Sequence, residues 1–77
     1  MSNGIQIKPS LMICAERIKE LRQEKNLSQS VLAQKIGVSQ KAIDYWERGT
    51  NEPKATYIVR LADFFDVSTD YLLRREN

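Results

Sequence analysis

Gly37 separates two short amphipathic segments, residues 28–36 and 39–48, and this arrangement restricts the fold more than any other feature of the sequence. Each segment begins with a serine, Ser28 or Ser39, whose hydroxyl can accept a hydrogen bond from an unpaired N–H group in the first turn of a helix. Glycine readily adopts the backbone conformation at which a helix ends and the chain turns. The connection is too short for a crossover between parallel strands. The region therefore predicts two helices that meet at a sharp corner.

Three further segments repeat apolar residues at helical spacing. The first runs from residue 11 to about 24, and we expect Asn26 to end it, because asparagine tolerates the left-handed conformation. The other two cover about 55–65 and 69–73, and Ser68 is expected to cap the last one. No stretch alternates polar and apolar residues for long enough to predict a strand. The prediction is an all-α fold of five helices, divided into an N-terminal arm (1–10), a folded domain (11–74) and a C-terminal tail (75–77).

Composition limits the functions open to a chain of 77 residues, which is enough for one domain. Histidine is absent and Cys14 is the single cysteine, so we expect no disulfide, metal site, cofactor or enzymatic activity. Cys14 falls on an apolar helical face and is interpreted as buried. No apolar stretch can span a bilayer and the first residues do not resemble a secretory signal, so a cytoplasmic protein is expected. The net charge of +2 permits nucleic-acid binding without indicating it.

The segment 39–48 exposes side chains that suit DNA, and an α-helix has the width to enter the major groove. Gln40 can form two hydrogen bonds with adenine, and Lys41 can reach guanine or a phosphate. Tyr45, one turn further on, can stack on a sugar, contact a thymine methyl group or bind a phosphate. Asp44 would repel phosphate unless it faces a cytosine amino group or solvent.

Polar residues at the ends of the two helices are expected to contact the phosphate backbone. Gln29 and Ser39 stand at helix N-termini, where backbone N–H groups favour phosphates. Four residues follow the second helix and could hold a flanking strand of DNA: Arg48, Thr50, Asn51 and Lys54. Taken singly, each of these residues could equally be solvated surface.

The order of these motifs along residues 17–73 resembles the Cro/cI-type (XRE, lambda-repressor-like) helix-turn-helix family of bacterial and phage regulators. The matching stretches include Ile18 to Arg22, Leu27-Ser28-Gln29, Leu32-Ala33, Gly37-Val38-Ser39, Ile43 through Gly49, Pro53 and Val67 through Leu73. The resemblance implies a compact five-helix domain of the lambda-repressor type, with the second and third helices as its reading unit.

The resemblance also implies roles for single residues. Gln29 would touch phosphate, and three residues of the third helix would face bases or their backbone: Gln40, Lys41 and Tyr45. Arg22, late in the first helix, would bond Glu47 after the third helix as a structural brace, although Arg22 could also sense a phosphate. Trp46 is interpreted as a core residue rather than a base-stacking one.

Sequence-specific binding to double-stranded DNA is the leading functional hypothesis, with transcriptional regulation as the outcome. A single module makes few contacts, so a homodimer on a pseudo-palindromic operator is expected, with half-sites roughly 34 Å apart. A repressor is favoured over an activator because the sequence contains no separate domain to recruit polymerase. Such a protein would be bacterial or phage-encoded. The alternative is an antitoxin-like or other protein-interaction module that uses the same fold, which the modest charge of +2 leaves open.

Overall fold

The computed structural model describes residues 9–73, with side chains described from Cys14 onward. The predicted all-α fold is confirmed, because this part of the chain forms five helices and no strand. The helices are α1 (Pro9–Glu24), α2 (Gln29–Ile36), α3 (Gln40–Arg48), α4 (Ala55–Phe65) and α5 (Thr69–Leu73). No helix among residues 9–73 is long and apolar enough to cross a membrane.

The first helix begins at Pro9 rather than at residue 11, where the folded domain was predicted to start. Proline suits the first helical position, because its φ angle is already helical and its missing N–H would have no partner there. The rest of the predicted arm, residues 1–8, and the predicted tail lie outside the described residues.

Serine caps begin three of the five helices, as predicted. The hydroxyl groups of Ser28, Ser39 and Ser68 each accept a hydrogen bond from the backbone N–H three residues later, at 2.9 to 3.1 Å. Each bond satisfies a donor that the helix itself leaves unpaired. Lys54 precedes α4 without a side-chain cap, and that helix still begins at Ala55.

Left-handed residues end the first four helices. Gly37 and Gly49 follow α2 and α3 with φ angles of 89° and 77°. Asn26 and Asp66, with φ angles of 58° and 57°, take this conformation after α1 and α4. Asparagine and aspartate tolerate the left-handed region better than most residues with a side chain. The short turns that change the direction of the chain therefore follow from the local sequence.

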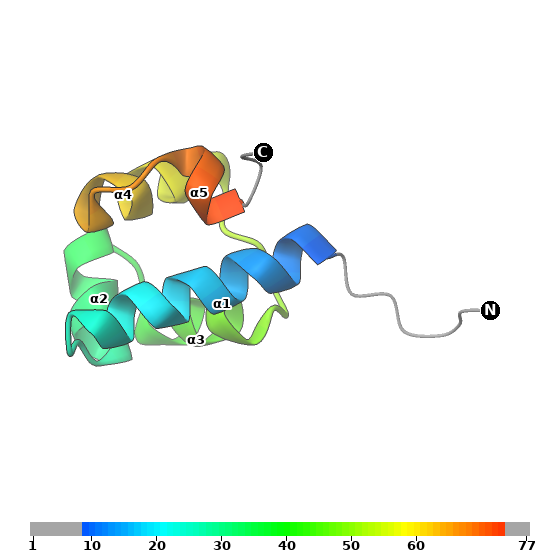
Figure 1. Cartoon of the computed structure of the whole chain (residues 1–77). Helices are drawn as coiled ribbons and strands as arrows, with labels where there is room; N and C mark the ends of the chain where they lie inside the picture. The colour runs from blue at the N-terminus through cyan, green and yellow to red at the C-terminus, as the bar shows by residue number, and fades with distance from the viewer. Residues whose placement is uncertain (1–8, 74–77) are drawn as a thin grey trace.

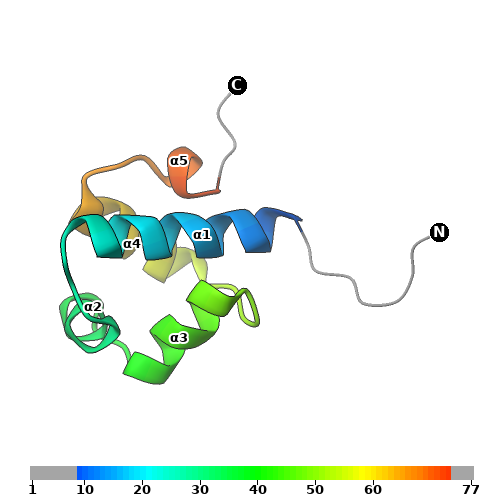
Figure 2. The same ribbon diagram turned by 60° about the horizontal axis from the view of Figure 1, so that its bottom comes forward.

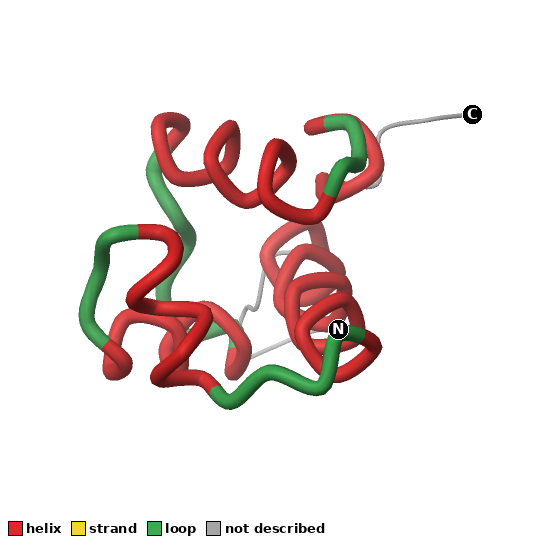
Figure 3. The backbone as a smooth tube through the Cα atoms, turned by 90° about the vertical axis from the view of Figure 1, so that its left-hand side faces the viewer, coloured by secondary structure: helices red, strands yellow, loops and turns green. Residues whose placement is uncertain are grey.

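The five helices enclose a single interior. In Figure 1, α4 and α5 lie above α1 and α3 lies below it; in Figure 2, α5 lies above α1, α2 and α3 lie below it, and α4 overlaps it. α1 contacts both α3 and α5, and α4 contacts α2 and α5. Figure 3 shows α2 and α3 grouped together when the molecule is viewed along α1. The helix pair α2–α3 thus projects from a scaffold made of the other three.

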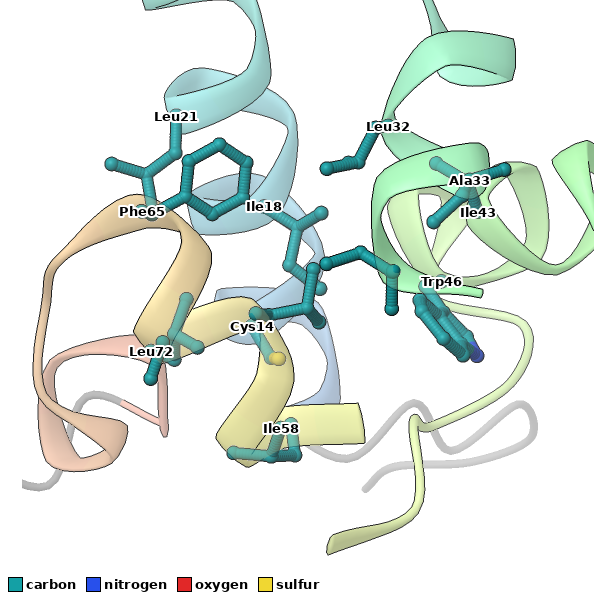
Figure 4. Packing of buried hydrophobic residues seen from close by; sticks show 13 residues of the cluster. Cys14, Ile18, Leu21, Leu32, Ala33, Ile43, Trp46, Ile58, Phe65 and Leu72 are labelled. Atoms are coloured by element: carbon teal, nitrogen blue, oxygen red, sulfur yellow. The ribbon is translucent and has the colours of Figure 1, made fainter. Parts of the chain in front are cut away.

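Every helix contributes side chains to the core. The least exposed large residues, at 0–1%, are Cys14 and Ile18 of α1, Leu32 of α2, Ile43 of α3, Leu61 of α4 and Leu72 of α5. Figure 4 shows most of these residues converging, together with Trp46. Trp46 is 6% exposed and its ring lies 5.6 Å from that of Tyr57, which confirms its interpretation as a core residue. Burial of one such side chain contributes roughly 1.5–3 kcal/mol.

Val31 differs from the other apolar residues of α2, because it is 37% exposed. The buried stripe of α2 consists of Leu32, Ala33 and Ile36. A helix of eight residues presents one such stripe to the core, and Val31 lies at its outer edge.

Candidate functional site

The corner between α2 and α3 is closed by backbone hydrogen bonds and by one side chain from α4. The N–H groups of Gly37 and Val38 both donate to the carbonyl oxygen of Ala33, at 2.8 and 3.0 Å. Arg60 Nη1 donates to the carbonyl oxygen of Ile36 at 3.1 Å. A Cβ atom added at Gly37 would lie 3.2 Å from the same guanidinium nitrogen. The scaffold thus holds the end of α2 in place through a long-range contact.

Arg22 and Glu47 join α1 to the end of α3. Arg22 Nε donates to Glu47 Oε2 at 2.6 Å and Nη2 donates to Oε1 at 2.9 Å, a two-point geometry that suits guanidinium and carboxylate. Arg22 Nη1 also donates to the carbonyl oxygen of Leu27 at 2.7 Å. The side chains are 12% and 3% exposed. The hydrogen bond to Glu47 raises the pKa of Arg22 above its usual value, against the opposing effect of burial.

Gln29 links the N-termini of α2 and α3 to this ion pair. Its amide nitrogen donates to Glu47 Oε1 at 3.1 Å and to Asp44 Oδ1 at 3.3 Å. Its amide oxygen accepts a hydrogen bond of 2.5 Å from Gln40 Nε2. The resemblance led us to expect Gln29 on a phosphate; in the chain without DNA, its amide nitrogen lies between two carboxylates of the protein itself.

Asp44 is occupied by partners that the sequence analysis did not consider. From the sequence we expected Asp44 to face either a cytosine amino group or solvent. In the structure, Asp44 Oδ2 pairs with Arg48 Nε at 3.0 Å, one helical turn further along α3, while Oδ1 accepts from Gln29. The negative charge of Asp44 is therefore balanced within the protein.

The remaining predicted residues of α3 form one exposed face. Gln40, Lys41, Tyr45 and Arg48 are all exposed, whereas Ile43 and Trp46 on the other side of the helix are buried. In Figure 2, α3 lies at the edge of the molecule that faces away from α5. The structure thus brings the proposed base-reading side chains together on an accessible helix surface.

The other predicted residues lie at the ends of α3 or beyond it. The hydroxyl of Ser39 is exposed and already caps the helix by accepting from the N–H of Ala42 at 3.1 Å. Thr50 Oγ1 donates to the carbonyl oxygen of Tyr45 at 3.1 Å and so closes the C-terminal end. Asn51 and Lys54 are exposed in the loop between α3 and α4 rather than on α3.

Arg60 is a positioning residue that the sequence analysis missed. In the sequence it is a charged residue within a helix, and nothing local distinguishes it from a solvated side chain. Its guanidinium also lies 5.5 Å from the ring centre of Tyr57. The role of Arg60 is visible only in the fold, where α4 brings its side chain to the carbonyl oxygen of Ile36.

Cys14 lies in the core and away from this surface, as expected. Burial, together with the negative charge of Glu52, raises the pKa of its thiol to about 11. At neutral pH the thiol is therefore protonated and a poor nucleophile. The described residues contain no group of three or more histidine, cysteine, aspartate or glutamate side chains placed to hold a metal ion.

Comparison with known proteins agrees with this geometry. A helix-turn-helix family model matches residues 18–72. The HTH-type transcriptional regulator YqaE of Bacillus subtilis, itself uncharacterised, is 35% identical over 63 residues, which are 82% of this chain and 54% of that protein. Repressor protein C2 of Salmonella phage P22 is 36% identical over 62 residues, 80% of this chain and 29% of the repressor. The chain therefore spans about half or less of the length of these relatives.

Solved structures extend the likeness to three dimensions. The crystal structure of the P22 c2 repressor in complex with a synthetic operator matches with a TM-score of 0.78 and 34% identity. The match covers 83% of this chain and 97% of that one.

Proposed function

Since this chain belongs to the helix-turn-helix family, we propose that it binds double-stranded DNA sequence-specifically and regulates transcription. The exposed face of α3 carries this proposal, because its polar side chains lie on a helix whose opposite face is anchored in the core. An α-helix fits the major groove of B-form DNA, where each base pair displays a distinct pattern of donors and acceptors. The P22 c2 repressor, which has the same fold, was solved in complex with a synthetic operator, and this supports DNA binding here.

Gln40 is assigned to adenine. One hydrogen of its amide is donated to Gln29, which fixes the plane of the amide group. The second N–H and the amide oxygen remain, and together they form the donor and acceptor pair that matches adenine N7 and N6.

Lys41 and Tyr45 extend the base-reading face, and the residues around α3 hold the DNA backbone. Lys41 is assigned to guanine or a neighbouring phosphate, and Tyr45 to a thymine methyl group or the sugar beside it. Six residues are assigned to phosphate contacts: Gln29, Ser39, Arg48, Thr50, Asn51 and Lys54. For Gln29 this contact requires its amide to leave Asp44 or Glu47, so it is assigned to complexes with arbitrary sequences, in which Gln40 reads no base.

Two substitutions on α3 test the assignment. Gln40→Ala and Lys41→Ala should each weaken binding to a preferred sequence by about 1–3 kcal/mol and relax the choice of base at one position. Lys19→Ala, which removes the same charge from the exposed surface of α1, is the matched control and should leave affinity unchanged. Binding curves on preferred and random DNA decide the matter. Equal losses on both would show that these side chains hold phosphate and read no base.

We further propose that the protein acts as a homodimer and as a repressor. One module of this size makes few base contacts, and two modules on half-sites roughly 34 Å apart would double them. Repression requires only that a promoter is occupied. Leu72 is fully buried and so is not available to a dimer contact. Selection of bound sequences from random DNA should return two inverted half-sites about 10 base pairs apart. A single unrepeated motif would contradict the dimer.

The alternative of a protein-interaction module, antitoxin-like or otherwise, makes a different prediction. Binding to a mixed pool of DNA should then be negligible even at low salt, whereas the proposed function requires an affinity that falls steeply as salt rises.

We assign the protein, bacterial or phage-encoded, to the cytoplasm, where the DNA lies. We assign it a binding role and no catalytic one.

A further inference from the structure

Asp44 is a negative charge on the helix that we propose to enter DNA, and both oxygens of its carboxylate are bound by the protein. Oδ1 accepts from Gln29 Nε2 at 3.3 Å, and Oδ2 pairs with Arg48 Nε at 3.0 Å. The side chains of Asp44 and Arg48 are 27% and 67% exposed. Exposed ion pairs on helices contribute little to folding stability. Stability alone therefore does not account for an aspartate at this position.

The partners of Asp44 are donors that a DNA phosphate would otherwise use. An amide nitrogen has two hydrogens, and those of Gln29 are directed at Asp44 and Glu47. Arg48 is held at Nε, and its charge is offset by the neighbouring carboxylate. In the free protein, Asp44 therefore binds donors that a phosphate oxygen could bind.

The contacts of Asp44 have opposite effects on binding to arbitrary DNA sequences and on reading of a specific sequence. Binding to arbitrary sequences comes from phosphate contacts, which need Gln29 and Arg48 to leave Asp44. Base reading by Gln40 instead needs Gln29 to stay, because Gln29 Oε1 accepts the hydrogen bond that orients the Gln40 amide. Asp44 therefore weakens binding to arbitrary sequences and favours base reading by Gln40.

We propose that Asp44 is a specificity-determining residue, whose carboxylate competes with phosphate for Gln29 and Arg48 and keeps Gln40 oriented for base reading. This inference rests on the proposed function, DNA binding through α3. Specificity is a difference between two affinities, and a group that weakens the unwanted complex increases it as effectively as one that strengthens the wanted complex.

Asp44→Asn tests this role, because asparagine has nearly the same shape and can still accept from Gln29 but no longer pairs with Arg48 by charge. The matched control is Asp63→Asn, an equal change of net charge at an exposed position of α4. Affinities of the wild type and both variants are measured on random DNA and on a sequence selected for wild-type binding, at several salt concentrations. Circular dichroism verifies that each variant is folded.

Release of Arg48 should add about one phosphate contact on random DNA. Asp44→Asn should therefore bind random DNA roughly 10-fold more tightly at low salt, and the slope of log affinity against log salt should steepen by about 0.9. Affinity for the selected sequence should rise less, so the ratio of the two affinities falls. Asp63→Asn should change neither the slope nor the ratio.

Two outcomes would overturn the role of Asp44: a ratio that does not fall, or a salt slope for Asp44→Asn that equals the wild-type slope. A third outcome concerns the proposed function itself. If the wild type binds no DNA at low salt, that function is wrong and the inference falls with it, whereas wild-type binding with an unchanged ratio contradicts the inference alone.

Discussion

Glu47 receives more polar contacts than any other carboxylate among the described residues, because both Arg22 and Gln29 donate to it. Glu47→Ala should lower the free energy of unfolding by about 2–4 kcal/mol, since it leaves the nearly buried guanidinium of Arg22 without its anion. Urea denaturation followed by the fluorescence of the buried Trp46 measures this loss. Glu20→Ala, at an exposed position of α1, should cost far less. Equal denaturation midpoints for the two variants would contradict the bracing role of Glu47.

The buried thiol of Cys14 makes stability depend on pH in the alkaline range. It loses its proton at about pH 9 when unfolded and at about pH 11 when folded, so the unfolded state binds fewer protons between these values. The thiol therefore makes its full contribution to the free energy of unfolding below pH 9. That contribution falls by up to about 2–3 kcal/mol as pH rises to about 11.

Cys14→Ala isolates this effect, because lysine and tyrosine titration is common to both proteins. The stability advantage of the wild type over the variant should shrink between pH 9 and 11, as measured by urea midpoints at several pH values. A constant difference over that range would show that Cys14 does not titrate as its burial implies.

At the scale of the elements, the corner between α2 and α3 depends on Gly37. Its φ angle of 89° is unfavourable for residues with a side chain, and an added Cβ would also press on Arg60. Gly37→Ala should therefore lower stability by about 1–2 kcal/mol. Gly37→Asn is the matched variant and should cost less, because asparagine tolerates the left-handed region. Thermal unfolding compares the two, and an alanine variant at least as stable as the asparagine variant would contradict this explanation.

The elements themselves could be predicted from the sequence because their signals are local. The cap of each serine reaches only three residues, and the left-handed turns at Asn26 and Gly37 depend on the residue in place. The contact of Arg22 with Glu47 could be anticipated only from the family resemblance.

The finer geometry of the candidate site could not be predicted, because it joins residues that are far apart in the sequence. The sequence assigned Gln29 to phosphate, and nothing in it indicates that the amide lies between Asp44 and Glu47. Arg60 is a similar case, since its contact with Ile36 depends on how α4 approaches α2. The exposure of Val31 could not be predicted either, because an apolar residue type alone does not determine whether a side chain is buried.

At the scale of the whole molecule, three helices act as a scaffold for the other two. α1, α4 and α5 supply most of the core, and the contacts of Arg22 and Arg60 hold α3 and the end of α2 against them. A surface fixed in this way loses little conformational freedom on binding, which favours selective recognition. We therefore expect DNA to contact one side of the molecule and to leave the rest of the fold unchanged.

Backbone amide NMR spectra, recorded while a duplex of the selected sequence is added, test whether α3 is the helix that reads DNA. If it is, signals from the start of α2 and from residues 39–51 should shift or broaden on binding. Signals from α5 and from the first turns of α1 should stay in place. The exception is any residue at the contact between two copies of the chain, which should form one separate patch. Changes limited to α4 and α5, with α3 unaffected at low salt, would contradict the assignment of α3 as the DNA-reading helix.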